Sequence, residues 1–388
     1  MKAFNFMLSA CVAAVAFTSC TKEDLPEIET RMKTVEVSLE NAVYSATRGL
    51  AGNKINHGDP VVVENLKIFL LDHAGKEYPA KVSDGTLPAK SYWTAAELAS
   101  SGLNAQFHYV DHGCTRIVAV ANLGDPDMTF EELQANQALG IDNEQDATSL
   151  SLYADAELKR KGNDQHQDQN AADGTTYISD VYEANLTLRP RISRFEVDGF
   201  RVAFNATPKY NEIKITDMLF DHYAKTTSLI TGVEGTSYEE HISDLTSQSI
   251  VYNWFNNSTK PAAWYWDALA DVTITPATPA VATASPLAYH IFSGNVVPRL
   301  VLKLIVDGQP AYLYSRGFYS ATEMENGKPK LIDEFKEGYI YRMSAEGVVD
   351  GTDGFIPIDE DDIDPMDRCI EISVVVEPWV VELVYPEF

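Results

Sequence analysis

The residues that could carry catalysis or bind a metal are scattered along this chain. None of the Gly-x-Ser-x-Gly, P-loop, dinucleotide-binding, His-Glu-x-x-His or Cys-x-x-Cys motifs occurs in its 388 residues. Among the eight histidines, His108 and His112 have the i,i+4 spacing of a helical metal site, but the segment around them has the composition of a strand. We therefore predict no metal site, no cofactor and no enzymatic activity.

The acidic run at 359–367 is a second candidate for chemistry. Its carboxylates would suit Ca²⁺, but the run lacks the glycine and the terminal glutamate of an EF-hand loop. We therefore predict that it is a solvated, extended hinge.

Cys20 is the residue whose position indicates a covalent modification. A basic residue, Lys2, precedes a short apolar run from Phe4 to Phe17, which is typical of a signal peptide and too short to span a bilayer. The run ends in Phe-Thr-Ser-Cys, which is similar to the lipobox of bacterial lipoproteins, where the cysteine thiol receives a diacylglycerol. An ordinary signal peptide with a chance cysteine is the alternative. We predict lipidation at Cys20 and free thiols at Cys114 and Cys369.

The charge balance excludes two classes of partner. The chain has 30 basic and 57 acidic residues and a formal net charge of −27, which is the wrong sign for nucleic acid or an anionic membrane. Its 45% hydrophobic content is sufficient for a buried core, and its 19 Tyr and 16 Phe favour strands. The composition therefore indicates a soluble, strand-rich protein.

The elements of the first half follow from hydrophobic alternation and capping motifs. Residues 34–44 alternate like a half-buried strand, with one apolar face made of Val35, Val37, Leu39 and Val43. Further strands are predicted at 61–71 and 116–122, the latter buried on both faces. Capping boxes at Thr94 and Thr129 predict two short helices, and residues 161–175 read as a polar loop.

From about residue 186 the pattern is mostly short strands, which is typical of β-sandwiches. Residues 275–286, rich in Pro, Ala and Thr, are predicted to be a loop or linker. The C-terminal segment 369–388 has one apolar face, made of Ile370, Ile372, Val374, Val376 and Val380.

These features together resemble the FimA/Mfa-type fimbrillins, the subunits of type V pili in Bacteroidales. The resemblance rests on Cys20, an early strand before a lone Arg48, and an apolar C-terminal strand. Local matches are the strand and turn at 62–75, the strand 117–122, which ends in Val-Ala-Asn, and the strand 186–197. Phe17 in the lipobox and the acidic 359–367 run depart from the family pattern.

The resemblance implies a mainly β fold with two transthyretin-like β-sandwich domains and a few short helices. It divides the chain into a lipoprotein signal peptide at 1–20, a propeptide with a strand at 21–48, an N-terminal domain at 49–185 and a C-terminal domain at 186–388 that ends in a donor strand at about 369–388.

The resemblance also implies a structural role. The precursor would be an outer-membrane lipoprotein that an arginine-specific protease cuts between Arg48 and Gly49, with Arg31 as a competing site. Loss of the early strand would open a sheet edge, to which the C-terminal strand of another fimbrillin subunit would add in the extracellular fimbrium.

Other interpretations of the same segments stay open. The early strand could be permanent, Arg48 a loop residue, and 370–380 the last strand of its own sandwich. The chain could be an anchor or tip fimbrillin, or a surface adhesin that binds a glycan or another host or bacterial ligand without Arg cleavage. Trp254, Trp264 and Trp266 could form a platform for a sugar, with core packing as the alternative.

Overall fold

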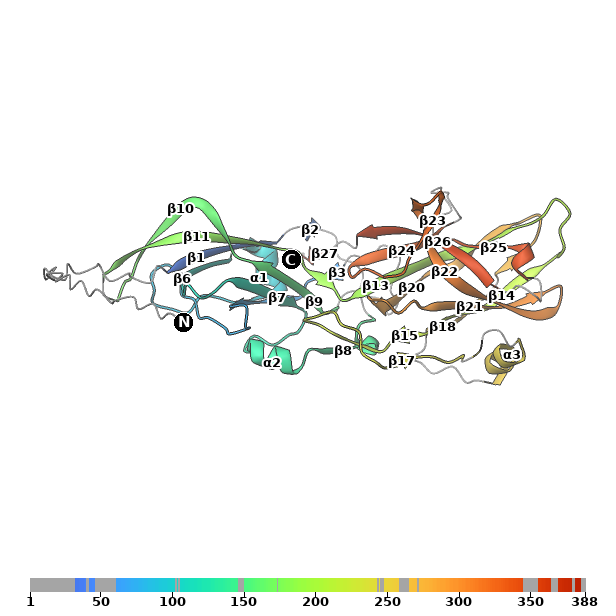
Figure 1. Cartoon of the computed structure of the whole chain (residues 1–388), viewed down its shortest axis with the longest axis horizontal. Coiled ribbons are helices and arrows are strands. Elements are labelled where there is room, and N and C mark those ends of the chain that lie inside the picture. Colours follow the sequence, from blue (N-terminus) through green and yellow to red (C-terminus); the bar gives the residue numbers. More distant parts are fainter. Residues whose placement is uncertain are drawn as a thin grey trace, which may run out of the picture.

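The chain folds into two β-rich halves along one long axis (Figure 1). A computed structural model describes residues 32–39, 42–45, 61–101, 103, 105–145, 150–172, 174–242, 244, 248–257, 265–270, 272–344, 355–363, 369–378 and 381–384. The described residues are mostly strands with a few short helices, so the prediction of a mainly β fold is confirmed. The domain boundaries at 20/21, 48/49 and 185/186 stay predictions.

Two sheets form the N-terminal half. The first has, in order, β10 (Lys159–Gln169), β11 (Thr176–Leu186), β1 (Lys33–Leu39) and β6 (Ala105–Val110). The second has β12 (Arg189–Pro190), β9 (Leu152–Glu157), β7 (Arg116–Ala121), β4 (Asn65–Leu71) and β5 (Tyr92–Thr94). Two short pairs lie outside these sheets: β8 (Ala138–Gly140) with β16 (Thr226–Ser228), and β15 (Tyr223–Ala224) with β17 (Tyr238–Glu239).

The two N-terminal sheets pack face to face as a sandwich. Val35 and Phe107 of the first sheet share one core cluster with Ile68 and Ile117 of the second. The intervening residues of the second sheet, such as Val118, point to its other face and pack against α2 (Phe130–Ala135). Alternation on a strand that is covered on both sides explains the continuous apolar run of β7.

One large sheet forms most of the C-terminal half. Its main path is β18 (Trp266–Ala268), β14 (Ile213–Asp221), β21 (Arg299–Val306), β22 (Gln309–Glu325), β26 (Cys369–Pro378), β24 (Tyr339–Ser344), β13 (Ile192–Ala203) and β20 (Ala280–Phe292). Three strands pair off this path: β19 (Thr273–Ile274) with β14, β23 (Lys328–Leu331) with β22, and β25 (Phe355–Asp359) with β13.

The large sheet folds back on itself around an aromatic core. Phe195 of β13 and Phe220 of β14 belong to strands that are far apart in the sheet order, yet their ring centroids are 5.3 Å apart. Phe318 and Phe335 also lie within 5.4 Å of the Phe195 ring. Burying rings of this size is a major source of stability in such a core.

Two capping boxes define helix starts as the sequence predicted. Thr94 donates its backbone N–H and its hydroxyl to Glu97 at the start of α1 (Ala95–Ser101). Thr129 and Glu132 cap each other at the start of α2. The other helices are η1 (Ile141–Asn143), α3 (Gln248–Asn257) and η2 (Glu360–Ile363).

Two predicted loops are wrong. Residues 161–175 include most of β10, whose polar residues form a strand because they pair with β11 at Lys159 and Arg160 and again from Gln165 to Gln169. Residues 275–286 include the start of β20, which pairs with β13. In both places the partner strand stabilises an extended backbone that the local sequence does not encode.

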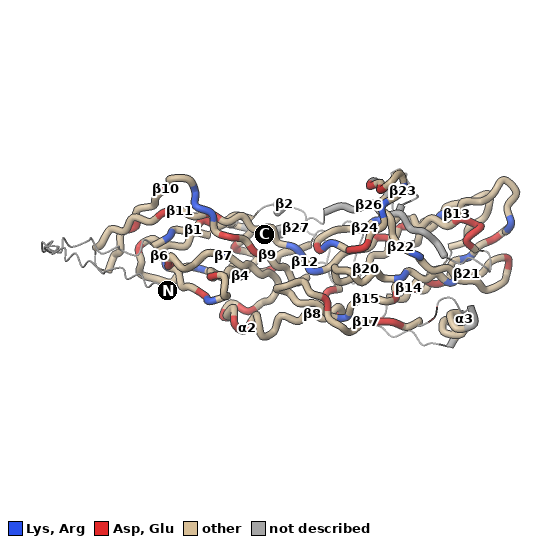
Figure 2. Tube along the Cα trace, in the orientation of Figure 1, with Lys and Arg blue, Asp and Glu red and all other residues tan. Residues whose placement is uncertain are grey.

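Acidic and basic residues are distributed along both halves (Figure 2). Within the part of the chain that the structure describes, the charged residues are therefore not confined to one segment. Within the described residues, no helix is long and apolar enough to cross a membrane.

Candidate assembly site

The strand predicted to be displaced, β1, lies inside the first N-terminal sheet. It pairs in parallel with β11, where Val35 faces Tyr182 and Val37 faces Ala184. On its other side it pairs antiparallel with β6, where Val35 faces Phe107. Figure 1 shows β1 between these strands. Because both edges of β1 are hydrogen-bonded, its removal would leave β11 and β6 each with an unpaired edge.

The side chains of β1 alternate as predicted. Val35 is fully buried and Val37 is buried, whereas Leu39 is half-buried and packs against the same core. Ser38 is exposed and donates to Asn185 at 2.5 Å. The apolar face of β1 is therefore part of the core of the N-terminal half.

Polar contacts fix the start of β1. Lys33 is buried, and its Nζ donates to the carbonyl of Cys114 at 2.6 Å and lies 4.4 Å from the ring centroid of Tyr182. Burial lowers the pKa of Lys33 from its ordinary value. The hydroxyl of Thr34 lies 2.6 Å from that of Ser179 on β11. These contacts fix the start of β1 against β11 and against the turn that holds Cys114.

Val43 lies on a separate strand. The predicted single strand at 34–44 is instead two strands, because β1 ends at Leu39 and β2 (Ala42–Ser45) joins a different sheet. In that sheet Val43 faces Glu382. The apolar positions of 34–44 therefore lie on two strands of different sheets, β1 beside β11 and β6, and β2 beside β27.

The C-terminal segment reaches the early strands. β27 (Val381–Val384) lies between β2 and β3 (Val61–Val62) and pairs in parallel with both. In sequence, β2 precedes Arg48 and β3 follows it. The two strands that flank β27 are thus on opposite sides of the predicted cleavage site.

The predicted donor residues fall mainly on β26. Ile370, Ile372, Val374 and Val376 occupy alternate positions of this strand, which pairs with β22 on one side and β24 on the other. Val380 lies outside the described residues, as do Cys20, Arg31, Arg48 and Gly49.

The acidic run does not form an extended, solvated hinge over its described part. Residues 360–363 are the 3₁₀ helix η2. The carboxylate of Glu360 is fully buried and accepts from the backbone N–H groups of Asn205 and Lys209 at 2.7 and 3.1 Å. Hydrogen bonding to backbone donors allows the Glu360 carboxylate to be buried, whereas Asp359 and Asp361 of the same run are exposed.

His108 and His112 do not come together, although their spacing is that of a helical metal site. His112 is exposed, whereas His108 is buried and contacts Asp168 and not His112. Among the described residues, His108, His166 and Asp168 form the only group of three side chains that could hold a metal ion. Sequence reasoning missed this group because Asp168 lies 60 residues from His108, in a segment read as a loop.

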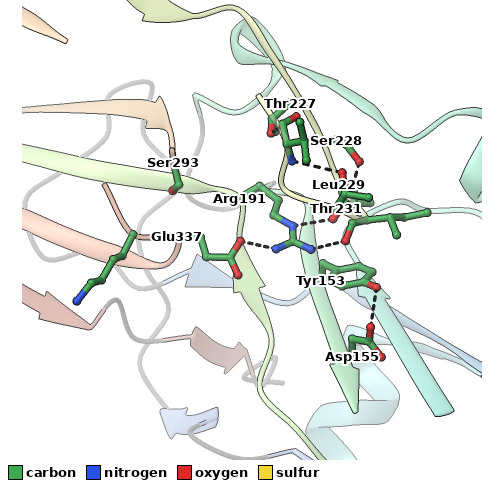
Figure 3. Close-up of polar contacts among 12 residues, drawn as sticks. Tyr153, Asp155, Arg191, Thr227, Ser228, Leu229, Thr231, Ser293 and Glu337 are labelled. Atoms are coloured by element: carbon green, nitrogen blue, oxygen red, sulfur yellow. Dashed lines mark hydrogen bonds and ion pairs between the residues drawn. The ribbon is translucent and has the colours of Figure 1, made fainter. Parts of the chain in front are cut away.

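Arg191 connects the two halves at their junction. Its guanidinium donates to the carbonyls of Leu229 and Ile230 at 2.7 and 2.8 Å and forms an ion pair with Glu337. It also lies 4.5 Å from the ring centroid of Tyr153 on β9. Figure 3 shows this side chain surrounded by elements of both halves. Planar guanidinium groups suit such a site because they stack and donate in several directions at once.

The tryptophans do not form an open platform over their described part. Trp266 is buried in a cluster with Leu219 and Phe255, and its ring centroid is 5.1 Å from that of Trp254. Trp264 lies outside the described residues. Core packing therefore accounts for Trp266.

Cys114 is a free, buried thiol, as predicted. Burial raises its pKa to about 11, so it is protonated at neutral pH. Cys369 is the first residue of β26.

No protein-family model matches the chain, and no curated protein matches it in sequence. Solved structures similar to it include a putative cell adhesion protein from Parabacteroides distasonis ATCC 8503, with 14% identity over 91% of this chain and 98% of that chain and a TM-score of 0.46. A putative cell adhesion protein from Bacteroides eggerthii DSM 20697 has 12% identity, coverage of 90% and 96%, and a TM-score of 0.43. A fimbrilin from Porphyromonas gingivalis W83 has 10% identity, coverage of 91% and 99%, and a TM-score of 0.43. Similarity at this level carries no conclusion about the function of this chain.

Proposed function

We propose that this protein is a structural subunit of a cell-surface pilus that assembles by strand exchange. In this proposal the precursor is lipidated at Cys20 and is cut after Arg48 by an arginine-specific protease. The cut chain loses β1 and β2 and takes up the C-terminal segment 369–388 of another subunit. The resemblance in sequence to fimbrillins suggested this pathway, and the arrangement of the strands around Arg48 supports it.

The observation that carries the proposal is the position of β1, β2 and β27. A cut after Arg48 would separate β1 from the core of the N-terminal half and β2 from the C-terminal strand β27 in one step. It would open the edges of β11 and β6 and one edge of β27. A single peptide bond thus controls both the acceptor site and a partner of the C-terminal segment.

The energetics favour replacement of β1 over an empty site. Loss of β1 removes two buried valines, each worth about 1.5–3 kcal/mol, and leaves unpaired backbone groups along two strands. Insertion of five aliphatic residues of an incoming strand would provide on the order of 10 kcal/mol before ordering costs. Because such a contact is head to tail, it does not close and produces a filament.

A second function is favoured by the position of β26. This strand has neighbours on both sides, so a donor role requires the pairing with β22 and β24 to break. An anchor or tip subunit, or an adhesin that keeps its lipid and its early strand, would retain both. The two functions differ in whether cleavage at Arg48 leads to polymers.

The test is cleavage of the purified precursor by an arginine-specific protease, followed by electrophoresis in SDS without boiling. We expect a ladder of oligomers from the wild type and from Arg31→Ala, and none from Arg48→Ala. We also expect no ladder when residues 369–388 are deleted. A ladder from the deletion variant would exclude this donor, and the absence of a ladder from the cut wild type would favour the anchor or adhesin function.

A further inference from the structure

The strands β6 and β10 are the outer strands of the first N-terminal sheet, yet they approach each other through three side chains. His108 comes from β6, and His166 and Asp168 come from β10. The Nδ1 atom of His108 lies 3.0 Å from both carboxylate oxygens of Asp168. The Nε2 atom of His166 lies 3.1 Å from Oδ1 of the same carboxylate.

The carboxylate of Asp168 is buried without full compensation. Asp168 is 3% exposed and His108 is 4% exposed. Although Oδ1 lies between two imidazoles, it accepts no hydrogen bond among the described residues. A buried carboxylate oxygen without a hydrogen bond is costly, and coordination of a cation removes that cost.

We propose that His108, His166 and Asp168 bind a divalent transition-metal ion of the Zn²⁺ type. Two imidazole nitrogens and one carboxylate oxygen are ligands that Zn²⁺ prefers, whereas Ca²⁺ and Mg²⁺ prefer oxygen alone. Donor atoms about 3.4 Å apart suit a tetrahedral ion with bonds of about 2.1 Å. One donor atom from each residue lies within 4.8 Å of the others, so small side-chain movements would complete the site.

The exposure of the His166 side chain provides an open coordination position. The His166 side chain is 42% exposed, so one side of the cluster is accessible to solvent. Three protein ligands and a water molecule, or a donor from another molecule, would fill a tetrahedral shell. An ion can therefore enter and exchange without unfolding the sheet.

The site also has a structural consequence for β1. The buried pair Thr34 and Ser179 joins β1 to β11, and the Ser179 hydroxyl donates to the carbonyl of His166 at 3.5 Å. A metal ion would join β10 to β6 across the same end of the sheet. The outer strands β10 and β6 would thus stay connected even when β1 is absent.

The test uses the purified chain after removal of metals with a chelator. Titration calorimetry with Zn²⁺ and visible absorption with Co²⁺ measure the stoichiometry and the coordination. We expect one ion per chain, the absorption of tetrahedral Co²⁺, and a higher melting temperature with Zn²⁺. His166→Ala and Asp168→Asn should each weaken Zn²⁺ binding by at least tenfold.

His112→Ala is the matched control, because His112 is an exposed histidine four residues from His108. It should bind Zn²⁺ like the wild type. Because the His166 side chain is 42% exposed, His166→Ala should retain the circular dichroism spectrum of the wild type. His166→Asn is a second variant at this position. Failure of the wild type to bind one ion, or equal loss of binding in His112→Ala and His166→Ala, would overturn the proposal.

Discussion

Two charged residues, Arg194 and Glu196, are buried in the C-terminal core. Arg194 and Glu196 on β13 are both fully buried and form an ion pair of 2.9 Å. Arg342 on β24 donates to the other oxygen of Glu196 at 3.1 Å. Such a pair adds little net stability, but the loss of one partner leaves the other charge buried and uncompensated.

We therefore predict that Glu196→Gln lowers the free energy of unfolding by about 3–5 kcal/mol. Urea denaturation monitored by fluorescence measures this change. Glu212→Gln is the control, because Glu212 pairs with Lys214 and both side chains are about half exposed, so the expected change is below about 1 kcal/mol. Equal losses in the two variants would show that burial of the pair has no effect.

His290 makes stability depend on pH. It is fully buried beside Arg194 and contacts the carbonyl of Glu144 at 2.8 Å through Nδ1. Burial lowers its pKa from 6.5 to about 3, with the Arg194 charge acting in the same direction. Between these two pH values the unfolded chain binds a proton that the folded chain does not, so stability falls as the pH falls.

We predict that His290→Asn reduces the loss of stability between pH 6 and pH 4 by about 1.4 kcal/mol per pH unit relative to the wild type. The asparagine amide can donate to the Glu144 carbonyl but does not titrate in this range. Urea denaturation at several pH values measures the slope. His112→Asn, at an exposed position, should keep the wild-type slope, and parallel curves for all three proteins would contradict the prediction.

At the scale of elements, the release of β1 should depend on its buried face. Val35→Ala removes apolar contacts from the core, whereas Ser38→Ala changes an exposed position of the same strand. A loss of about 2 kcal/mol of packing would speed dissociation of the cut propeptide by more than tenfold. We expect faster oligomer formation after cleavage in Val35→Ala than in Ser38→Ala. Equal rates would show that departure of β1 does not limit assembly.

The elements predicted correctly are those whose sequence carries its own periodicity or caps. The strand at 116–122 and the helices after Thr94 and Thr129 agree with the structure to within a few residues. The predicted strand at 61–71 is instead two strands, β3 and β4, which belong to different sheets. β10 was missed because its polar sequence forms a strand only by pairing with β11. Alternation at 34–44 predicts one strand, because alternation does not show that the two parts of the segment pair with different sheets.

For the candidate sites too, the sequence predicts local patterns but not contacts between distant segments. The apolar face of β1 was visible in the sequence, because Val35 and Val37 follow the period of a strand. The group of His108, His166 and Asp168 was not visible, because its members come from two strands that lie about 60 residues apart in the chain and at opposite ends of the sheet order. Contacts between distant segments are what local spacing cannot encode.

At the scale of the whole molecule, the two halves are connected at more than one point. Arg191 provides one, since it connects Glu337, two carbonyls and the Tyr153 ring across the junction (Figure 3). The pairing of β8 with β16 provides a second connection.

We predict that Arg191→Ala lowers the free energy of unfolding by about 2–3 kcal/mol, because it leaves a buried network without its donor. The two halves should then unfold at separate urea concentrations, which fluorescence and circular dichroism detect as transitions that no longer coincide. Arg189→Ala, at an exposed position two residues earlier, should unfold like the wild type. The same loss in both variants would contradict the role of Arg191 at the junction.

In the proposed pathway, cleavage of one peptide bond, after Arg48, would remove β1 and β2 together. The most direct measurement is the N-terminal sequence and intact mass of the protein recovered from the surface of the cells that produce it. We predict a chain that begins at Gly49 and carries no lipid. A chain that retains residues 33–45 behind an acylated Cys20 would contradict the account.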